Sequence, residues 1–335
     1  MARKPRIEYE GAVYHVMCRG NGGCDIFISD GDRRQFLDTL EEACARTGWL
    51  VHAFCLMGNH YHVLLETPEA NLVAGMKWLQ GTYTQRFNSR HKRWGHLFQG
   101  RYKALLVDTN SGEYFSTLST YIHLNPARAH LFDLDAGDLK EFRWSSYPLY
   151  LDVSVRPVWL CVDRVLGNFH GEDDSAGRRR YRQYMQKRVR ELSICTNPSE
   201  CDPAWAEIRK GWFLGDETFR AQLMDRMDGV MKGKHRSSFS GEQVRGHDLI
   251  EAERLIKTGL EALGLSEHDL NKLLKNCPQK YAVAWLARRN TCVENRWIKD
   301  RLQMGRATNF ATFLKRMEQG DFGEEYFEKV KNIIS

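Results

Sequence analysis

The sequence lacks the patterns that mark several large classes of protein. It has no run of 18 apolar residues, which argues against a transmembrane helix. It has nine cysteines, an odd number, and none stands in a CxxC pair. Neither a zinc site nor a disulfide framework is therefore predicted, and we expect reduced thiols. The N-terminus has basic residues but no apolar signal-peptide core, so we expect a cytoplasmic protein that does not enter a membrane.

The net charge of the chain is neither strongly positive nor strongly negative. The 335 residues carry a net charge of +6, and 42% of them are hydrophobic. This is ordinary globular composition, and the length suits two domains with a sizeable core. The modest positive excess permits a polyanionic partner without demanding one.

The first part of the chain alternates between strand and helix patterns. Runs rich in β-forming residues predict strands at 12–19, 49–57, 60–66 and 101–107. Apolar residues at helical spacing predict helices at 32–46, about 71–88 and about 111–124. The order β-α-β-β-α-β, followed by a helix, is that of the ferredoxin-like split βαβ fold. We therefore predict an α+β protein whose antiparallel sheet carries helices on one face.

The remainder of the chain is expected to be all-helical. Residues 171–180 are charged and contain glycine, which favours a linker and divides the chain into domains 1–170 and 171–335. The segment 212–215 is expected to begin a helix. Helices are also predicted at 278–290, 293–304 and 308–317, with Gly305 between the last two. This pattern over 278–317 suits a helix-turn-helix, and a three-helix module that binds other proteins fits nearly as well.

A pair of histidines stands out in the third predicted strand. His60 and His62 flank Tyr61, and alternate strand residues project from the same face. Paired imidazoles can hold a divalent cation, to which a carboxylate or amide oxygen would be added. With 12 histidines in the chain such a pair also arises by chance, so two ordinary core or surface histidines are the alternative.

The last predicted helix of the first domain offers a nucleophile. Tyr121 and Asn125 are four residues apart, so they share one face of the helix. Phenol is a weak nucleophile at neutral pH, but a metal that polarises a phosphodiester would let Tyr121 attack it. Asn125 would bring its amide oxygen to that metal as a third ligand. The alternatives are a core tyrosine and an asparagine that caps the helix before Pro126.

Basic and aromatic residues surround these elements in the sequence. The basic ones are Lys92, Arg93, Arg101, Lys103 and Arg128. The aromatic ones are Tyr83, Trp94, Phe98 and Tyr102. Basic side chains for phosphates and aromatic rings for stacking suit single-stranded DNA, although solvated charges and core aromatics would give the same pattern.

Three segments, taken together and in order, resemble a known family. They are His60-Tyr61-His62, Gly100–Ala104 and Tyr121–Ala129. They look like the HUH-type single-strand DNA transposases, in particular the REP-associated tyrosine transposases. The Arg19-Gly20-Asn21 break after the first strand also fits, and Ala127 stands where that family usually has valine. The resemblance covers about residues 5–150.

This resemblance implies a ferredoxin-like fold and a specific activity. It implies that His60, His62 and Asn125 bind Mg²⁺ or Mn²⁺. It also implies that Tyr121 cleaves hairpin-containing single-stranded DNA, forming a 5′-phosphotyrosine link and releasing a 3′-OH. DNA contacts are expected from Arg19, Asn21, Arg101, Lys103 and Arg128.

Other interpretations of the chain stay open. The segment 278–317 resembles the replication-initiator-type DNA-binding helices of some transposase relatives, which would add duplex DNA as a partner. A monomer is expected, with a dimer as the alternative. The alternative functions are a non-catalytic DNA-binding regulator on the same fold and, less well supported, a metal-dependent hydrolase of small substrates.

Overall fold

The structure is a computed structural model of the whole chain. It describes residues 6–169, 171–195, 205, 208–209, 211–231, 242–291, 293–305 and 309–333. By its internal contacts the chain divides into two units, Glu8–Gln222 and a second unit formed mainly by Leu223–Ser335. The sequence predicts the domain boundary at 170/171, whereas residues 171–222 belong to the first of these units.

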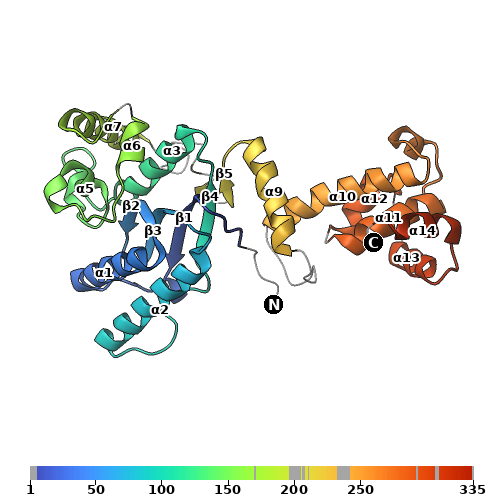
Figure 1. Cartoon of the computed structure of the whole chain (residues 1–335), viewed down its shortest axis with the longest axis horizontal. Helices are drawn as coiled ribbons and strands as arrows, with labels where there is room; N and C mark the ends of the chain where they lie inside the picture. Colours follow the sequence, from blue (N-terminus) through green and yellow to red (C-terminus); the bar gives the residue numbers. More distant parts are fainter. Residues whose placement is uncertain are drawn as a thin grey trace. The chain divides into compact units, whose positions relative to one another are not determined.

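The first unit is built on one sheet (Figure 1). Its predicted strands are β1 (Ala12–Arg19), β2 (Leu50–Leu56), β3 (His60–Thr67) and β4 (Lys103–Val107). They lie in the order β2-β3-β1-β4, and every neighbouring pair among them is antiparallel. This is the ferredoxin-like order predicted from the sequence, so the α+β fold class is confirmed.

A fifth strand extends the sheet beyond the prediction. β5 (Phe213–Leu214) pairs in parallel with β4 at the sheet edge. The Leu106 amide donates to the Trp212 carbonyl at 3.1 Å, and the Asp108 amide donates to the Leu214 carbonyl at 2.8 Å. The predicted helix start at 212–215 is therefore wrong. A two-residue strand has too little alternation to be seen in a sequence, and it forms because an edge strand leaves backbone groups unpaired.

Helices cover both faces of the sheet, whereas the sequence predicts them on one face only (Figure 1). α1 (Asp30–Thr47) and α2 (Leu72–His91) cover one face, where Tyr61 packs against Phe36 with ring centroids 4.8 Å apart. α3 (Gly112–His123) covers the other face, to which His62 points. Because strand side chains alternate, Tyr61 belongs to the core and its two histidine neighbours face α3.

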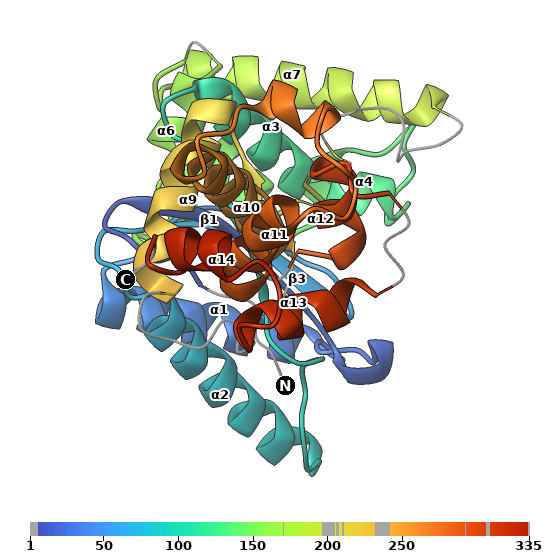
Figure 2. The ribbon, with the colours of Figure 1, turned by 90° about the vertical axis from the view of Figure 1, so that its right-hand side faces the viewer.

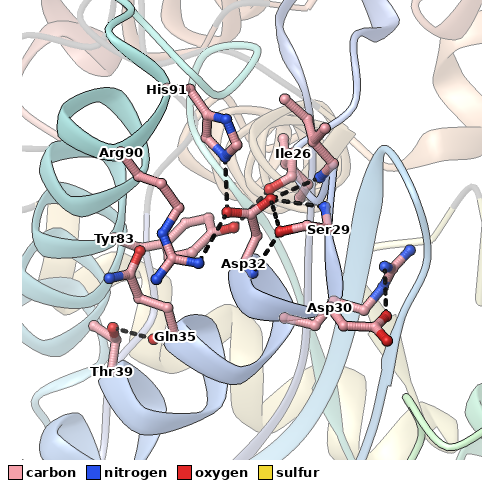
Figure 3. Close-up of polar contacts among 11 residues, drawn as sticks. Ile26, Ser29, Asp30, Asp32, Gln35, Thr39, Tyr83, Arg90 and His91 are labelled. Atoms are coloured by element: carbon pink, nitrogen blue, oxygen red, sulfur yellow. Dashed lines mark hydrogen bonds and ion pairs between the residues drawn. The ribbon is translucent and has the colours of Figure 1, made fainter.

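A buried carboxylate joins α1 to the end of α2 (Figure 3). Asp32 is fully buried and accepts hydrogen bonds from the backbone amides of Ile28 and Ser29, while Ser29 caps the helix in return. His91, the last residue of α2, lies with its Nε2 2.8 Å from Asp32 Oδ1, and Arg90 lies 3.7 Å from the same oxygen. These contacts satisfy a charge that would be costly to bury alone.

A long helix after the sheet belongs to the first unit. α7 (Ser175–Ile194) packs against α4 (Asn125–Arg128), α5 (Tyr147–Leu151) and α6 (Asp163–Gly167). It lies on the same side of the sheet as α3 (Figure 2). The hydroxyl of Tyr181, fully buried in α7, lies 2.6 Å from Nδ1 of the equally buried His123. The linker predicted at 171–180 is thus largely the start of α7, whose apolar face was hidden among seven basic residues of 178–190.

The second unit is helical where the structure describes it. After α9 (Glu217–Met231) come α10 (Glu242–Ala262), α11 (Pro278–Asn290), α12 (Asn295–Arg301), α13 (Phe310–Glu318) and α14 (Glu324–Lys331). α11 packs against α10, α12, α13 and α14, and its buried residues include Ala282 and Leu286. Gly305 lies between α12 and α13 in the left-handed region, with φ of 64°. The three predicted helices of 278–317 are therefore present.

Two further sequence expectations concern membranes and cysteines. No helix within the described part of the chain is long and apolar enough to cross a membrane. Cys195 is disulfide-bonded, so the expectation of reduced thiols is wrong at this position. The cytoplasmic location stays a prediction.

Candidate active site

The two histidines of the HxH motif lie at the beginning of a central strand. His60 is the first residue of β3 and lies opposite Arg19, and His62 lies opposite Met17 on β1. His62 is 2% exposed, whereas His60, at the end of the strand, is partly exposed. Their ring centroids are 5.1 Å apart. The pair thus joins a buried imidazole to one that solvent can reach.

Each of these rings has its Nδ1 occupied by a neighbour. His60 Nδ1 lies 2.8 Å from the side-chain oxygen of Asn59, which can only accept, so the ring donates there and its Nε2 keeps a lone pair. His62 Nδ1 lies 2.8 Å from Nε2 of His15, a buried residue of β1. In both histidines Nε2 is the atom left to face a ligand.

Burial keeps these three imidazoles neutral. It lowers the pKa of His60 to about 4, with further lowering from the charges of Arg19 and Arg128. It lowers the pKa of His62 well below the ordinary value, and the pKa of His15 to about 3 with a contribution from Lys103. A neutral imidazole is the form that binds metal ions.

Tyr121, a residue of α3, packs directly against His62 and His15. Its ring centroid lies 5.9 Å from that of His62 and 6.0 Å from that of His15, both edge to face. Trp205 covers it at 5.9 Å, and only 3% of Tyr121 is exposed. The structure therefore brings the predicted nucleophile to the predicted metal pair, but under a cover of other side chains.

Asn125 caps α3 through its amide nitrogen and keeps its amide oxygen as an acceptor. Its Nδ2 donates to the backbone carbonyls of Tyr121 and Ile122, at 3.1 and 3.2 Å, and so caps α3. This fixes the amide orientation and leaves Oδ1 as the acceptor, with a long 3.4 Å hydrogen bond from Arg128. The two alternatives weighed for this residue are therefore compatible, because they use different atoms.

The donor set suits a divalent cation. The atoms on offer are two imidazole nitrogens from the histidine pair and one amide oxygen from Asn125, a mixture that Mn²⁺ tolerates well and Mg²⁺ accepts with added water. In the described ranges no group of three or more His, Cys, Asp or Glu side chains is placed to hold a metal. A site here would thus depend on the Asn125 amide.

The predicted DNA-binding residues fall into different settings. Arg19 and Asn21 are exposed on either side of Gly20, where a Cβ would lie 1.9 Å from the Cys24 carbonyl oxygen, so this turn requires glycine. Arg101 is exposed and lies two residues before β4, whereas the sequence predicts that this strand begins at residue 101. Lys103 Nζ donates to the Arg209 carbonyl oxygen.

Arg128 lies closest to the proposed nucleophile. Its guanidinium carbon is 4.4 Å from the centroid of the Tyr121 ring and 5.0 Å from that of Trp205. The cation is therefore held by two aromatic rings beside the proposed metal ligands.

The structure separates the aromatic residues that the sequence grouped together. Tyr83, Phe98 and Tyr102 are buried and belong to the core. Trp94 is 90% exposed, in the loop between α2 and β4, next to the exposed side chains of Lys92 and Arg93. Only Trp94 of this set is available to stack on a base.

Sequence reasoning missed His15 and Trp205. His15 stands in the alternating run of β1 on the same face as Met17, so the predicted strand order contains the signal that it neighbours the histidine pair. Trp205 is fully buried, yet it carries no local pattern that would link it to Tyr121.

A known protein family and a solved structure are similar to parts of the chain. Residues 8–125 match the family model described as transposase IS200 like. A solved structure of a REP-associated tyrosine transposase bound to a REP hairpin is 12% identical, with a TM-score of 0.38, covering 49% of this chain and 93% of that chain. No curated protein matches the chain. The matched residues include the sheet strands β1–β4, α3 with Tyr121, and Asn125, and they make up about a third of the chain.

Proposed function

We propose that the chain cleaves and transfers single-stranded, hairpin-containing DNA through a covalent bond to Tyr121. The observation that carries this proposal is the contact between Tyr121 and His62, whose ring centroids lie 5.9 Å apart on the face of the sheet that presents the histidine pair. The IS200-like family match of residues 8–125 supports the same reaction class.

The proposed step is a transesterification. The phenolic oxygen of Tyr121 bonds to phosphorus and loses its proton, while the bond from phosphorus to O3′ breaks and that oxygen takes up a proton. The products are a 5′-phosphotyrosine and a free 3′-OH. Because the phosphotyrosine keeps the energy of the ester, a second 3′-OH can reseal the strand without a nucleotide cofactor.

Three side chains would hold a divalent cation beside Tyr121. We assign this to Nε2 of His60, Nε2 of His62 and Oδ1 of Asn125, because the other polar atom of each side chain makes a hydrogen bond and Asn125 Oδ1 accepts a long one, at 3.4 Å, from Arg128. When bound, Mg²⁺ or Mn²⁺ supplies charge that polarises the scissile phosphate and orients it. Arg128 adds a fixed positive charge at the Tyr121 ring.

The DNA path is proposed to run over residues near the start of β3. Arg19 and Asn21 lie at the turn that is hydrogen-bonded to Asn59 through Gly20, at 2.8 Å. Arg101 and Lys103 follow the loop that carries Trp94. Basic groups for the backbone and one exposed indole for a base form a site for single-stranded DNA.

The helices of the second unit are proposed to bind duplex DNA. α12 and α13 are separated by the Gly305 turn, and the exposed side chains of α13 include Lys315 and Arg316. This supports a helix-turn-helix with α13 in the major groove. Binding of duplex DNA, measured by mobility shift, should weaken in the full-length double variant Lys315→Ala/Arg316→Ala, with hairpin cleavage unchanged.

We propose that the protein is a monomer.

The central experiment tests for a covalent adduct. The full chain is incubated with a labelled library of single-stranded hairpins and Mn²⁺ and run on a denaturing gel. A labelled protein band is expected for the wild type and none for Tyr121→Phe. An adduct that persists in Tyr121→Phe would exclude this tyrosine. DNA binding without any adduct, unaffected by chelator, would favour the alternative of a non-catalytic regulator.

A further inference from the structure

We propose that His15 is a positioning residue for the metal site: it accepts a hydrogen bond from His62 and thereby leaves Nε2 of His62 unprotonated. The inference rests on the proposed metal site of this chain. It assigns a role to a residue that the chemistry of cleavage does not itself require.

The two rings meet end to end. His15 Nε2 and His62 Nδ1 are 2.8 Å apart, the ring planes differ by 18° and the centroids are 5.1 Å apart. A centroid distance so much longer than the nitrogen-to-nitrogen distance means that the rings are aligned along the hydrogen bond rather than stacked face to face. The hydrogen bond is therefore close to the ring planes, where an imidazole lone pair points.

The sheet register creates this contact. His15 pairs with Leu64 and Met17 pairs with His62, so His15 and His62 are diagonal neighbours on one face of an antiparallel pair. They are 1% and 2% exposed, so bulk water does not compete for the hydrogen bond. The contact is thus enforced by two central strands.

The protons decide what this contact can do. A neutral imidazole has one donor nitrogen and one acceptor nitrogen. If His15 donated, His62 would accept at Nδ1 and carry its own proton on Nε2, which would block metal binding. If His62 donates, its Nε2 lone pair faces the ligand. Only the second arrangement is compatible with the proposed site, and it requires His15 to carry its proton on Nδ1.

His15 also contacts the proposed nucleophile. Its ring centroid is 6.0 Å from that of Tyr121, about as far as Tyr121 is from His62. One buried side chain therefore sets both the proton position of His62 and part of the surface on which Tyr121 packs. Hydrogen-bonded partners of metal-binding histidines act in this way by fixing the tautomer and the ring orientation.

The first test reads the tautomer directly in the DNA-free, metal-free protein. Two-dimensional NMR of ¹⁵N-labelled histidine side chains should show the proton of His62 on Nδ1, and that of His15 on Nδ1 as well. A proton on Nε2 of His62 would overturn the proposal. This readout needs neither metal nor cleavage.

The second test measures Mn²⁺ binding by calorimetry in three full-length variants. His15→Phe keeps a buried ring but no acceptor, and its affinity should fall about 10- to 100-fold. His15→Gln offers an amide oxygen near the lost nitrogen and should recover most of the affinity. His52→Phe is the matched control, because His52 is also buried in the sheet but pairs with Glu66.

The outcomes separate this inference from the proposed function. Equal Mn²⁺ affinity of wild type and a folded His15→Phe protein would refute the role of His15, whatever the cleavage result. Failure of the wild type to form a DNA adduct, with Mn²⁺ affinity still dependent on His15, would refute the proposed function alone. Thermal melting shows whether His15→Phe is folded. If it is not, the tautomer spectrum of the wild type decides.

Discussion

Arg128 lies over the ring of Tyr121, with its guanidinium carbon 4.4 Å from the ring centroid, and Trp205 contacts the same guanidinium at 5.0 Å. An arginine held between two rings is fixed in orientation and partly shielded from water, which strengthens its electrostatic effect. The same side chain donates a long hydrogen bond to Asn125 Oδ1. Arg128 therefore contacts both the proposed nucleophile and a proposed metal ligand.

Replacing Arg128 should slow adduct formation, and more so when its charge is removed than when its charge is kept. Arg128→Lys keeps the charge but loses the planar stack, worth about 1 kcal/mol, so the rate should fall roughly fivefold. Arg128→Met removes the charge as well and should lower the rate about 100-fold. Single-turnover kinetics with a hairpin substrate measure both. Equal rates for all three proteins would contradict a role for this cation.

Metal removal should abolish cleavage and leave DNA binding in place. Chelation, or His60→Ala, removes the proposed cation but not the basic residues that contact phosphates. Adduct formation on denaturing gels should be lost, and hairpin affinity by fluorescence anisotropy should change less than about threefold. His268→Ala is the matched control, since His268 is an exposed histidine of the second unit. Undiminished adduct in His60→Ala would remove this ligand from the site.

Trp94 should contribute to binding single-stranded DNA. Its indole is 90% exposed beside Lys92 and Arg93, and stacking of a base on an aromatic side chain is worth about 1–3 kcal/mol. Trp94→Ala should therefore weaken hairpin affinity roughly 5- to 150-fold at fixed salt, with unchanged thermal stability. Val158→Ala controls for the loss of an exposed apolar side chain, because Val158 is 99% exposed. An unchanged affinity in Trp94→Ala would place the DNA path elsewhere.

Asp32 should make the stability of the first unit depend on pH. Burial raises the pKa of this carboxyl, but hydrogen bonds from His91 and Ser29 outweigh it and hold the pKa below 3.8. The folded pKa is thus below the unfolded one. The stabilisation is present above the unfolded pKa and is lost as pH falls through the folded value.

The variant Asp32→Asn tests this directly. At pH 7 its free energy of unfolding in urea should be about 2 kcal/mol below that of the wild type, and the difference should shrink as pH falls below 3.8. Asp225 is an exposed residue of α9, and Asp225→Asn should have little effect on the free energy of unfolding at pH 7 or below pH 3.8. A difference that does not depend on pH would mean that the Asp32 charge does not stabilise the fold.

Much of the first unit could be predicted from local pattern. The strand 12–19 was predicted with the bounds of β1, and 60–66 falls one residue short of β3, because alternating β-forming residues mark a half-buried strand. α7 was partly assigned to a linker because Tyr181, Met185 and Val189 stand among charged residues that hide its apolar stripe. β5 was not predicted, because two residues are too few to show the alternating pattern of a strand.

The candidate site was only partly readable from the chain. The four-residue spacing of Tyr121 and Asn125 predicted that they lie close together, because one helical turn is set by neighbouring residues alone. The exposure of these residues was not readable: Tyr121 is buried because Trp205, 84 positions further along the chain, lies against it. Likewise, sequence treated Trp94 and Phe98 alike, although only Trp94 is left outside the core.

The sequence by itself determined the α+β strand order, the histidine pair on one strand face and the tyrosine on the helix after the fourth strand. These follow from the periods of strands and helices, which act over a few residues. Only the tertiary structure decided that His15 lies against His62, that Arg128 packs against Tyr121 and Trp205, and that α7 packs against α4, α5 and α6 of the first unit. Those contacts depend on strand register and on packing between distant segments, which no local spacing records.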